Sequence, residues 1–436
     1  MKTLLLVAGR SQRFWPLSEK TLFPLCGTNL LALTLQRLAA AGVRDVTVVG
    51  GTHNLDLVRP LFPHLPTIEQ EDLDLGMRGA LLSALPSCNE EPTLVVCAND
   101  IIESKGYSAL LAAGIQKGVS GALLAQRVER YFPGGYLQQD ANGRLTGIVE
   151  KPGPGKEPSN LMNIVVHIHN HPEKLFVALQ QTKGKADGAY ERAIGSLLKD
   201  HVYRAVPYEG TWQAVKYPWH LLDLLPALLS EIKTPVIHPT VQVHPTAVLD
   251  GPIVLGEGVR VFPHATVRGP CVIGAQSVIA NNALVRGSSI GEHCVVGFGS
   301  EVKSSVLAQY VWTHMSYVGD SVIGSNVSFG GGSMTGNLRL DEMEISSAIQ
   351  GKPVATGHTK FGTVIGDHCR LGIHTSINPG CKIGAGSFIG SHSLISQDIP
   401  DGSFVTTRGG ELVIRPNKTP PLEPGGRAAY RSEALG

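Results

Sequence analysis

From about residue 236, aliphatic residues recur at every sixth position, and this spacing limits what the second half of the chain can fold into. The first run consists of Ile237, Val243, Leu249, Leu255, Val261, Val267, Ile273, Ile279 and Val285. The spacing resumes at Ile365, Leu371, Ile377, Ile383, Ile389 and Ile395. A helix repeats every 3.6 residues and a strand every two, so neither produces this period. A β-helix of six-residue sides does, because one aliphatic residue of each side fills the interior.

Small residues often follow the aliphatic ones by four positions, where glycines and small residues suit the corners of a coil. Stacked coils bury a columnar core, and roughly five to eight coils fit this length. The stretch 338–360 breaks the period, so we predict an inserted hairpin or loop there. We therefore predict a left-handed parallel β-helix over 236–408. The residues 409–436 are rich in Pro, Gly and charge and are predicted to form a disordered tail.

The first half alternates apolar strands with helical patterns, which predicts an α/β nucleotide-binding type of domain with a Rossmann-like mixed, mostly parallel sheet over 1–228. The expected strands are "TLLLVAG", "VRDVTVVGG" and "EPTLVVCAND", and the expected helices are "NLLALTLQRLAAAG", closed by Gly42, and "LGMRGALLSAL". Ligands of such sheets bind beyond the C-terminal ends of the strands. Gly9 and Asp100 are both expected at that edge.

Composition excludes several classes of protein. The formal net charge of the 436-residue chain is +1, which argues against a nucleic-acid surface or a polybasic membrane anchor. No apolar run reaches the ~18 residues of a membrane span, and the first strand lacks a cleavage site for secretion. We expect a cytoplasmic protein. The 7 cysteines form no CxxC pair, so neither a disulfide framework nor a zinc site is expected.

The loop after the first strand carries unusual positive charge. Ala8 and Gly9 can present backbone N–H groups to a phosphate, and Arg13 and Lys20 can neutralise its charge. The alternative is a basic surface loop. Asp100 ends an apolar strand, where a carboxylate near phosphates suits Mg²⁺; the alternative is a simple helix cap.

Further motifs extend this loop into a recognisable set. In order, the chain contains "LVAGRSQRFWPLSEKTLFPL", "EQEDLDLG", "VVCAND", "GIVEKPG", "MNIVVHIHN" and "GTWQAVKYPWHLLDLL". Over residues 1 to about 225 this resembles the sugar-1-phosphate nucleotidyltransferases, which join a nucleoside triphosphate to a sugar 1-phosphate and release pyrophosphate. The resemblance implies Mg²⁺ and a reaction that depends on positioning and charge stabilisation.

By that resemblance, Arg13 and Lys20 bind the triphosphate as catalytic cations, Gln70 and Gly76 contact the nucleobase, and Asp100 binds the metal. The sugar-contacting positions are Gly135, Glu150, Lys151 and Asn163.

The sequence also departs from the family pattern. Ser11 and Gln12 replace the second glycine and the threonine of the "GxGTR" loop, Met77 replaces the threonine of "LGTA", and Ala214 replaces a second metal carboxylate. A metal site with one ligand missing should bind Mg²⁺ more weakly. Whether this half is active, slow or altered in nucleotide choice stays open.

The stretch "EVKSSVLAQYVWTHMSYVGDSVIGSNVSFGGGSMTGNLRLD" resembles the acetyltransferase half of the bifunctional N-acetylglucosamine-1-phosphate uridyltransferases. The inserted 338–360 and "KFGTVIGDH" resemble those of archaeal-type members. The resemblance implies acetyl-CoA as donor and a homotrimer with the coenzyme bound between subunits.

It also implies roles for single residues. His314 would be the general base that takes a proton from the attacking amine, and Asn337 an amide near the sugar and the developing oxyanion. For a lone histidine the alternative is an exposed corner residue. The remaining positions are Arg286, Lys303, Tyr317 and Lys360 for the sugar phosphate, and Gly331 and Ile373 for acetyl-CoA.

Together these features predict an enzyme that acetylates glucosamine 1-phosphate and couples N-acetylglucosamine 1-phosphate to UTP. Three alternatives remain open. One is an acetyltransferase with a degenerate nucleotidyltransferase domain, favoured by Met77 and Ala214. Another is a different sugar-1-phosphate nucleotidyltransferase with a structural or regulatory β-helix. The last is a scaffold that only trimerises.

Overall fold

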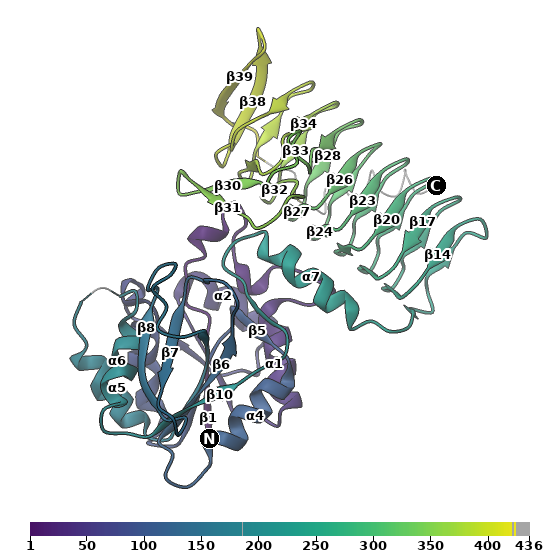
Figure 1. Ribbon diagram of the computed structural model, residues 1–436. Coiled ribbons are helices and arrows are strands. Elements are labelled where there is room, and N and C mark those ends of the chain that lie inside the picture. The colour runs from purple at the N-terminus through teal and green to yellow at the C-terminus, as the bar shows by residue number, and fades with distance from the viewer. Residues whose placement is uncertain (185, 421–422, 424–436) are drawn as a thin grey trace. The chain divides into compact units, whose positions relative to one another are not determined.

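The computed structural model describes residues 1–184, 186–420 and 423 (Figure 1). The chain forms two compact units. The first contains Met1–Arg10 and Leu30–Ala214, and the second contains Ser11–Asn29 and the residues from Val215 onward. The segment Ser11–Asn29, which includes most of the basic loop after the first strand, therefore belongs to the second unit.

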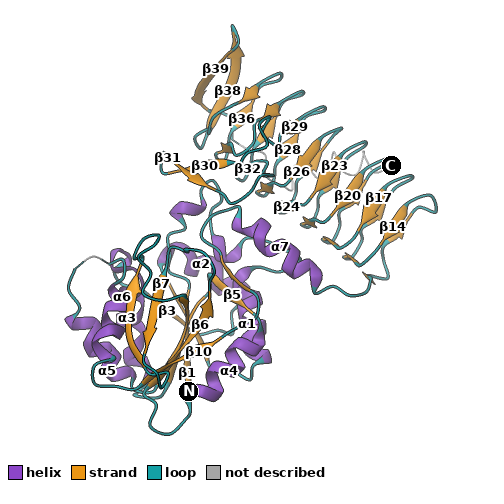
Figure 2. Ribbon diagram, viewed as in Figure 1, coloured by secondary structure: helices purple, strands orange, loops and turns teal. Residues whose placement is uncertain are grey.

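The first unit is built on a mixed sheet with the strand order β10-β6-β9-β4-β1-β2-β3; β7 also pairs with β9, and β8 pairs with β7. Figure 2 shows this sheet in orange among the purple helices of the unit. Its strands are β1 (Lys2–Leu6), β2 (Val46–Gly50), β3 (Thr67–Glu69), β4 (Thr93–Cys97), β6 (Gly121–Arg127), β7 (Gly135–Gln139), β8 (Leu145–Glu150), β9 (Leu161–His169) and β10 (Tyr203–Pro207). The pairs β1–β2, β1–β4, β2–β3 and β6–β10 are parallel, whereas β9 runs antiparallel to β4 and β6. The predicted α/β domain with a mixed sheet is confirmed.

The helices of this unit are α1 (Leu30–Ala40), α2 (Thr52–Leu61), α3 (Gly76–Ala84), α4 (Ser104–Gly114), α5 (Pro172–Gln181) and α6 (Ala189–Leu197). As predicted, Gly42 closes the first helix, and its φ of 88° is one that glycine adopts without strain. A separate two-stranded sheet pairs β5 (Asp100–Ile102) with β11 (Trp212–Ala214).

The second unit is a column of coils with three faces, and every strand on a face pairs in parallel with the strand one coil on (Figure 1). One face holds β12 (Val236–Ile237), β15 (Ile253–Leu255), β18 (Cys271–Ile273), β21 (Ser289–Ile290), β24 (Val306–Leu307), β27 (Val322–Ile323), β32 (Val364–Ile365) and β35 (Lys382–Ile383). The next holds β13 (Gln242–Val243), β16 (Arg260–Val261), β19 (Val278–Ile279), β22 (Val295–Val296), β25 (Trp312–Thr313), β28 (Ser328–Phe329), β33 (Arg370–Leu371), β36 (Phe388–Ile389) and β38 (Ser403–Arg408). The last holds β14 (Val248–Asp250), β17 (Thr266–Arg268), β20 (Leu284–Arg286), β23 (Glu301–Lys303), β26 (Tyr317–Gly319), β29 (Met334–Thr335), β34 (Ser376–Ile377) and β37 (Leu394–Ile395). The predicted β-helix is confirmed.

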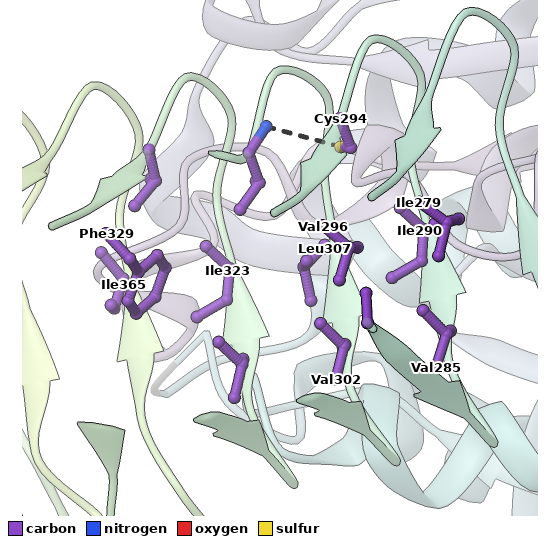
Figure 3. Close-up of a cluster of buried hydrophobic side chains, with 14 of the residues drawn as sticks. Ile279, Val285, Ile290, Cys294, Val296, Val302, Leu307, Ile323, Phe329 and Ile365 are labelled. Atoms are coloured by element: carbon purple, nitrogen blue, oxygen red, sulfur yellow. Dashed lines mark hydrogen bonds between the residues drawn. The ribbon is translucent and has the colours of Figure 1, made fainter. Parts of the chain in front are cut away.

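The period-six residues form the interior of this column. Figure 3 shows Ile279, Val285 and Ile290 pointing into one continuous apolar core with residues of the following coils. A buried thiol, Cys294, accepts a hydrogen bond from the backbone N–H of Val311 at 3.4 Å, so even the short polar groups are paired (Figure 3). The core continues through the middle of the domain, where the sequence no longer follows a strict period of six.

The stretch 338–360 leaves the column between two coils. It contains an antiparallel hairpin of β30 (Ser346–Ile349) and β31 (Lys352–Ala355), as predicted. The helix α7 (His220–Ser230) also belongs to this unit. Another hairpin pairs β38 with β39 (Glu411–Pro416), so the region predicted as a disordered tail begins with an ordered strand. The predicted start of the disordered tail at residue 409 is therefore too early. Residues 421–422 and 424–436 of the predicted tail lie outside the described residues.

Within the described ranges, none of the helices has both the length and the apolar content needed to cross a membrane.

Lys382 joins three segments that are distant in the sequence. Its side chain is 0% exposed, and its Nζ lies 2.7 Å from Asp398 Oδ2. The same nitrogen donates to Ser347 Oγ at 3.1 Å, in the inserted hairpin, and lies 5.4 Å from the centre of the Trp15 ring. A buried charge is tolerated only when paired in this way. Lys382 thus fastens the hairpin and the Ser11–Asn29 segment to the column.

We predict that Lys382→Ala lowers the free energy of unfolding by about 3 kcal/mol, because it leaves the Asp398 carboxylate without its cation and opens a cavity. Urea denaturation followed by circular dichroism measures this. The matched control is Lys352→Ala, an exposed lysine of the same hairpin, for which we expect a change under about 0.5 kcal/mol. Equal losses in both variants would contradict the role given to Lys382.

Candidate functional sites

The predicted phosphate and metal residues of the first unit meet at one edge of its sheet. β1 and β4 are parallel neighbours with Leu6 opposite Cys97, so the residues that follow them emerge at the same edge. Ala8 and Gly9 follow β1, and Asp100 follows β4. A Cβ on Gly9 would meet no atom within 4 Å, so the backbone there is open to approach. The predicted placement of Gly9 and Asp100 at the strand ends is confirmed.

Gln70 and Gly76 are also brought together. The Gln70 side chain is buried, and its Nε2 donates to the carbonyl oxygens of Asp72 at 2.7 Å and Gly76 at 2.9 Å. Gly76 has a φ of 56° that disfavours larger residues. The Gln70 amide therefore holds the turn that leads into α3.

Asp100 accepts a hydrogen bond from a residue of the neighbouring strand. The indole Nε1 of Trp212 donates to Asp100 Oδ1 at 2.9 Å. Ala214 is the residue directly opposite Asp100 in the antiparallel pair β5–β11. Directly opposed residues have Cβ atoms about 5 Å apart, so a carboxylate at position 214 would lie beside that of Asp100. Among the described residues, no cluster of three or more His, Cys, Asp or Glu side chains suits a metal.

The predicted sugar residues of the first unit cluster around Gly135. A Cβ on Gly135 would lie 3.1 Å from Glu150 Oε2 and 3.5 Å from Asn163 Cβ, so these three residues are in contact. Lys151 follows Glu150 and pairs with Asp187 at 2.7 Å. A side chain larger than glycine at 135 would therefore crowd both Glu150 and Asn163.

Arg13 and Lys20 lie in the segment Ser11–Asn29, which belongs to the second unit. Arg13 is exposed. Ser11, which stands where the family has glycine, has a φ of 49°, so the loop keeps a left-handed backbone without the residue that suits it. Glu19 accepts hydrogen bonds from the backbone N–H and hydroxyl of Thr21, at 3.0 and 2.7 Å, which fixes the turn that carries Lys20.

In the β-helix, the predicted phosphate-binding residues occupy adjacent rows of one face. Arg286 on β20 is in register with Lys303 on β23. Each has an acidic partner: Arg286 pairs with Glu301 at 2.7 Å, and Lys303 Nζ lies 2.9 Å from Asp320 Oδ2. The Lys303–Asp320 pair is mostly shielded, with 16% and 13% of the side chains exposed. The two cations therefore stand side by side at the edge of the column.

The remaining sugar residues join this cluster one coil on. Asn337 Nδ2 donates to the Tyr317 hydroxyl at 3.0 Å and also to Asp320 Oδ2. Lys360 is brought close by an antiparallel bridge to Leu338, the residue after Asn337. Burial is the main cause that raises the pKa of Tyr317. The structure thus unites Arg286, Lys303, Tyr317, Asn337 and Lys360 along one edge.

His314 lies at a different position on the same coil as Tyr317, in a row with Phe298, Gly331 and Ile373. The backbone ladder places them: Met315 N donates to Phe298 O, Gly332 N to His314 O, and His374 N to Gly331 O. A Cβ on Gly331 would lie 3.3 Å from His314 Cδ2. His314 is exposed, and so are Phe298 (47%) and Ile373 (49%). In this row His314 therefore lies between the exposed side chains of Phe298 and Ile373. Its direct neighbour Gly331 has no side chain and leaves room beside the imidazole ring.

The sequence did not predict a functional role for three residues of these clusters, Asp320, Glu301 and Phe298. Asp320 and Glu301 look like ordinary corner and strand residues until the coils are stacked, and Phe298 breaks no pattern. Asp320 has a φ of 47°, a backbone conformation in which Asp is more common than most residues. In the sequence, the "GD" at residues 319–320 indicates a turn and no more.

Models of known protein families match both halves of the chain. The MobA-like NTP transferase domain matches residues 3–236. The GMPPB C-terminal domain matches residues 232–328, and six repeats of the bacterial transferase hexapeptide match residues 362–397. The nucleotidyltransferase domain is thus intact over the whole first half of the chain.

Curated relatives cover nearly the full length. A bifunctional sugar-1-phosphate nucleotidylyltransferase/acetyltransferase of Sulfurisphaera tokodaii is 31% identical over 412 residues, covering 93% of this chain and 99% of the relative. The bifunctional protein GlmU of Methanocaldococcus jannaschii is 32% identical over 425 residues, covering 95% and 99%. The bifunctional protein GlmU of the bacterium Heliobacterium modesticaldum is 25% identical over 455 residues, covering 93% and 95%.

Glu191 is an acidic residue near Glu150 with an altered titration. Burial, aided by the charges of Glu150 and Asp187, raises the pKa of Glu191 to about 7. A glutamate in the unfolded chain titrates near 4.3. Between those two values the folded state binds more protons, so the stability falls as the pH rises, and the loss is complete above about pH 7.

We predict that Glu191→Gln removes this loss. The variant should match the wild type in free energy of unfolding at about pH 4 and exceed it by about 1–3 kcal/mol at pH 8, after allowing for partial solvent screening. Urea unfolding at a series of pH values tests it, with Glu209→Gln, an exposed glutamate of the same unit, as the control. A difference that does not grow with pH would contradict the prediction.

Proposed function

The chain belongs to the family of bifunctional sugar-1-phosphate nucleotidylyltransferase/acetyltransferases, and from this premise we propose its substrates. The β-helix transfers the acetyl group of acetyl-CoA to glucosamine 1-phosphate. The nucleotidyltransferase domain then transfers UMP from UTP to N-acetylglucosamine 1-phosphate, giving UDP-N-acetylglucosamine and pyrophosphate. The protein is cytoplasmic and homotrimeric, and its exposed Phe298 and Ile373 support an assembly that covers them.

The observation that carries the acetyltransferase assignment is the cluster along the edge of the column. Arg286 and Lys303 offer adjacent positive charges to a phosphate, and Asn337 and Tyr317 offer polar groups beside them. His314 comes from the same coil as Tyr317 and lies in the row with Gly331 and Ile373. A scaffold that only trimerises would have no use for these paired cations and amides.

In the acetyl transfer, the amine nitrogen of the sugar attacks the thioester carbonyl while His314 accepts the proton that the nitrogen loses. The C–S bond then breaks and coenzyme A leaves as the thiol after taking up a proton. We assign Asn337 to a place near the sugar and the oxygen on which negative charge develops. Its Nδ2 donates to Tyr317 and Asp320, so one of these two N–H groups would turn to that oxygen during the reaction. Gly331 leaves space beside the imidazole for the donor.

For nucleotidyl transfer we assign triphosphate binding to Arg13, Lys20 and the backbone of Ala8 and Gly9. Gln70 and the turn at Gly76 contact the base, and Gly135, Glu150 and Asn163 contact the sugar. The family match over residues 3–236 gives no support to a degenerate domain. A different sugar-1-phosphate nucleotidyltransferase is the second candidate, favoured by the GMPPB C-terminal match; the full-length bifunctional relatives weigh against it.

Asp100 is the residue that we assign to Mg²⁺. Asp100 offers a carboxylate and Ala214, the residue opposite it, offers none; Mg²⁺ commonly takes one or two carboxylates together with substrate phosphates and water. Asp100 therefore fits a site completed by the triphosphate. When bound, the metal would neutralise charge that develops on the phosphates.

A single assay tests both activities. The protein is incubated with glucosamine 1-phosphate, acetyl-CoA, UTP and Mg²⁺, and free coenzyme A and pyrophosphate are followed separately. We expect both products. Coenzyme A without pyrophosphate, with any nucleoside triphosphate, would leave only the acetyltransferase; pyrophosphate without coenzyme A would leave only the nucleotidyltransferase.

We predict that Asp100→Asn abolishes pyrophosphate release and leaves coenzyme A release unchanged, because the metal loses the carboxylate that we assign to it. Ala214→Asp should lower the Mg²⁺ concentration needed for half-maximal pyrophosphate release, since a second carboxylate then faces Asp100. Ala214→Asn, equal in size but neutral, is the control. If Asn and Asp at position 214 act alike, the missing charge is not what limits the metal site.

We predict that His314→Ala lowers the rate of acetyl transfer by about 10²–10⁴-fold, the usual contribution of general acid–base catalysis. The wild-type rate should fall at low pH as the imidazole and the substrate amine become protonated, and the variant should lose the part due to His314. The control is His264→Ala, another exposed corner histidine of the column, which should stay near the wild-type rate. Near-normal acetylation by His314→Ala would show that another group is the base.

A further inference from the structure

A chain of buried hydrogen bonds runs behind the proposed sugar site and is not used by any role given above. His167 Nε2 lies 2.8 Å from Asn163 Oδ1, and His167 Nδ1 lies 2.8 Å from the Tyr190 hydroxyl. The same hydroxyl lies 2.9 Å from His169 Nε2, and His169 Nδ1 lies 3.0 Å from the Tyr203 hydroxyl. Both histidines are 0% exposed. Asn163 is the one member of this relay that also contacts Gly135 and the sugar cluster.

The contact between Asn163 and His167 requires a departure from regular strand geometry. Four residues along a regular strand span about 13 Å, which is too far for a direct hydrogen bond between these two side chains. In the pairing of β6 with β9, Leu123 faces His167 and Ala125 faces Asn163, so β9 uses two more residues than β6 over this stretch. Bulges of this kind often re-aim side chains next to active sites. Here the bulge brings the His167 ring to the Asn163 amide.

The order of donors along the relay follows from two features: the histidines are neutral, and Asn163 Oδ1 is the atom that lies beside His167 Nε2. Burial lowers the pKa of His167 far below its ordinary value and that of His169 to about 3. A neutral imidazole has one donor and one acceptor nitrogen. Since Asn163 Oδ1 can only accept, the Nε2 of His167 carries the proton and its Nδ1 accepts from Tyr190. Tyr190 then accepts from His169, and His169 accepts from Tyr203, so every member is satisfied.

This order leaves the Nδ2 group of Asn163 as the part of its amide not engaged by the relay. The opposite tautomer of His167 would take a proton from the amide and leave the carbonyl oxygen for a ligand. The relay therefore decides whether Asn163 presents a donor or an acceptor. An apolar residue at position 167 would fill the core equally well but would leave the amide free to turn.

We propose that His167, held by Tyr190, is a positioning residue that fixes the Asn163 amide with its N–H₂ group presented to an oxygen of the sugar 1-phosphate. This rests on the proposed sugar site. It goes beyond that site in assigning a buried residue that touches no substrate, and it predicts a selective effect on the sugar substrate.

The test measures binding as well as turnover. Isothermal titration gives the dissociation constant of N-acetylglucosamine 1-phosphate, and pyrophosphate release gives the KM of that sugar and of UTP. We expect His167→Phe to raise both constants for the sugar about tenfold, the worth of one fixed hydrogen bond, with the KM of UTP unchanged. His167→Gln retains a donor and an acceptor and should recover most of the loss.

Two further variants separate positioning from simple support of the fold. His169→Phe alters an equally buried histidine of the same strand that does not touch Asn163; it should lower the melting temperature as His167→Phe does but change sugar binding less than threefold. Asn163→Asp keeps the acceptor for His167 and removes the donor, so it should weaken sugar binding as strongly as His167→Phe. If His167→Phe does not fold, His167→Gln and Asn163→Asp still carry the test.

Equal losses of sugar binding in His167→Phe and His169→Phe, or equal rises in the KM of UTP and of the sugar, would overturn the inference while leaving the proposed function in place. If the wild type binds no N-acetylglucosamine 1-phosphate, the proposed sugar fails first, and the inference fails with it.

Discussion

Parallel ladder hydrogen bonds between successive coils are the interaction on which the second unit depends. Val254 faces Val272 across such a ladder, and Val272 faces Ser289. Each side chain therefore has its neighbours set by the length of a coil rather than by its place in the sequence. This is how Arg286 and Lys303, seventeen residues apart, come to stand in adjacent rows. Because the column interior must be apolar, the reactive groups are confined to its corners and edges.

The same constraint explains how far the sequence could predict this unit. Coils of eighteen residues keep the interior positions at a strict spacing of six, so the sequence alone predicts them. From Val272 to Ser289 and from Val306 to Val322 the coils shorten to seventeen and sixteen residues, and the spacing disappears although the fold continues. A corner can lose a residue without changing what faces inward. The motif identified His314, Tyr317 and Asn337 but not Asp320, whose ion pair depends on the coil beside it.

In the first unit the sequence predicted the strand ends but not the contacts across the sheet. Gly9 and Asp100 follow apolar runs, so their common edge could be predicted from alternation alone. The hydrogen bond between Asn163 and His167 could not, because strand periodicity separates them and only the bulge in β9 joins them. The conformation of Ser11 could not be predicted either, because a φ of 49° is uncommon for a residue other than glycine and nothing in the sequence around it marks it.

The assignment of Ser11–Asn29 to the second unit bears on how such a protein can change in evolution. Trp15 donates its indole N–H to Asp401, and Cys26 N donates to Ser289 Oγ, so this early segment is tied to coils encoded hundreds of residues later. A gene that lost its 3′ half would encode a segment 11–29 without the coil residues to which Trp15 and Cys26 are bonded. The two activities therefore cannot be exchanged between proteins as freely as separate domains joined by a linker. Recombination that separates the two ends of the coding sequence would break these contacts. We therefore expect the two halves of the gene to be inherited and to diverge together.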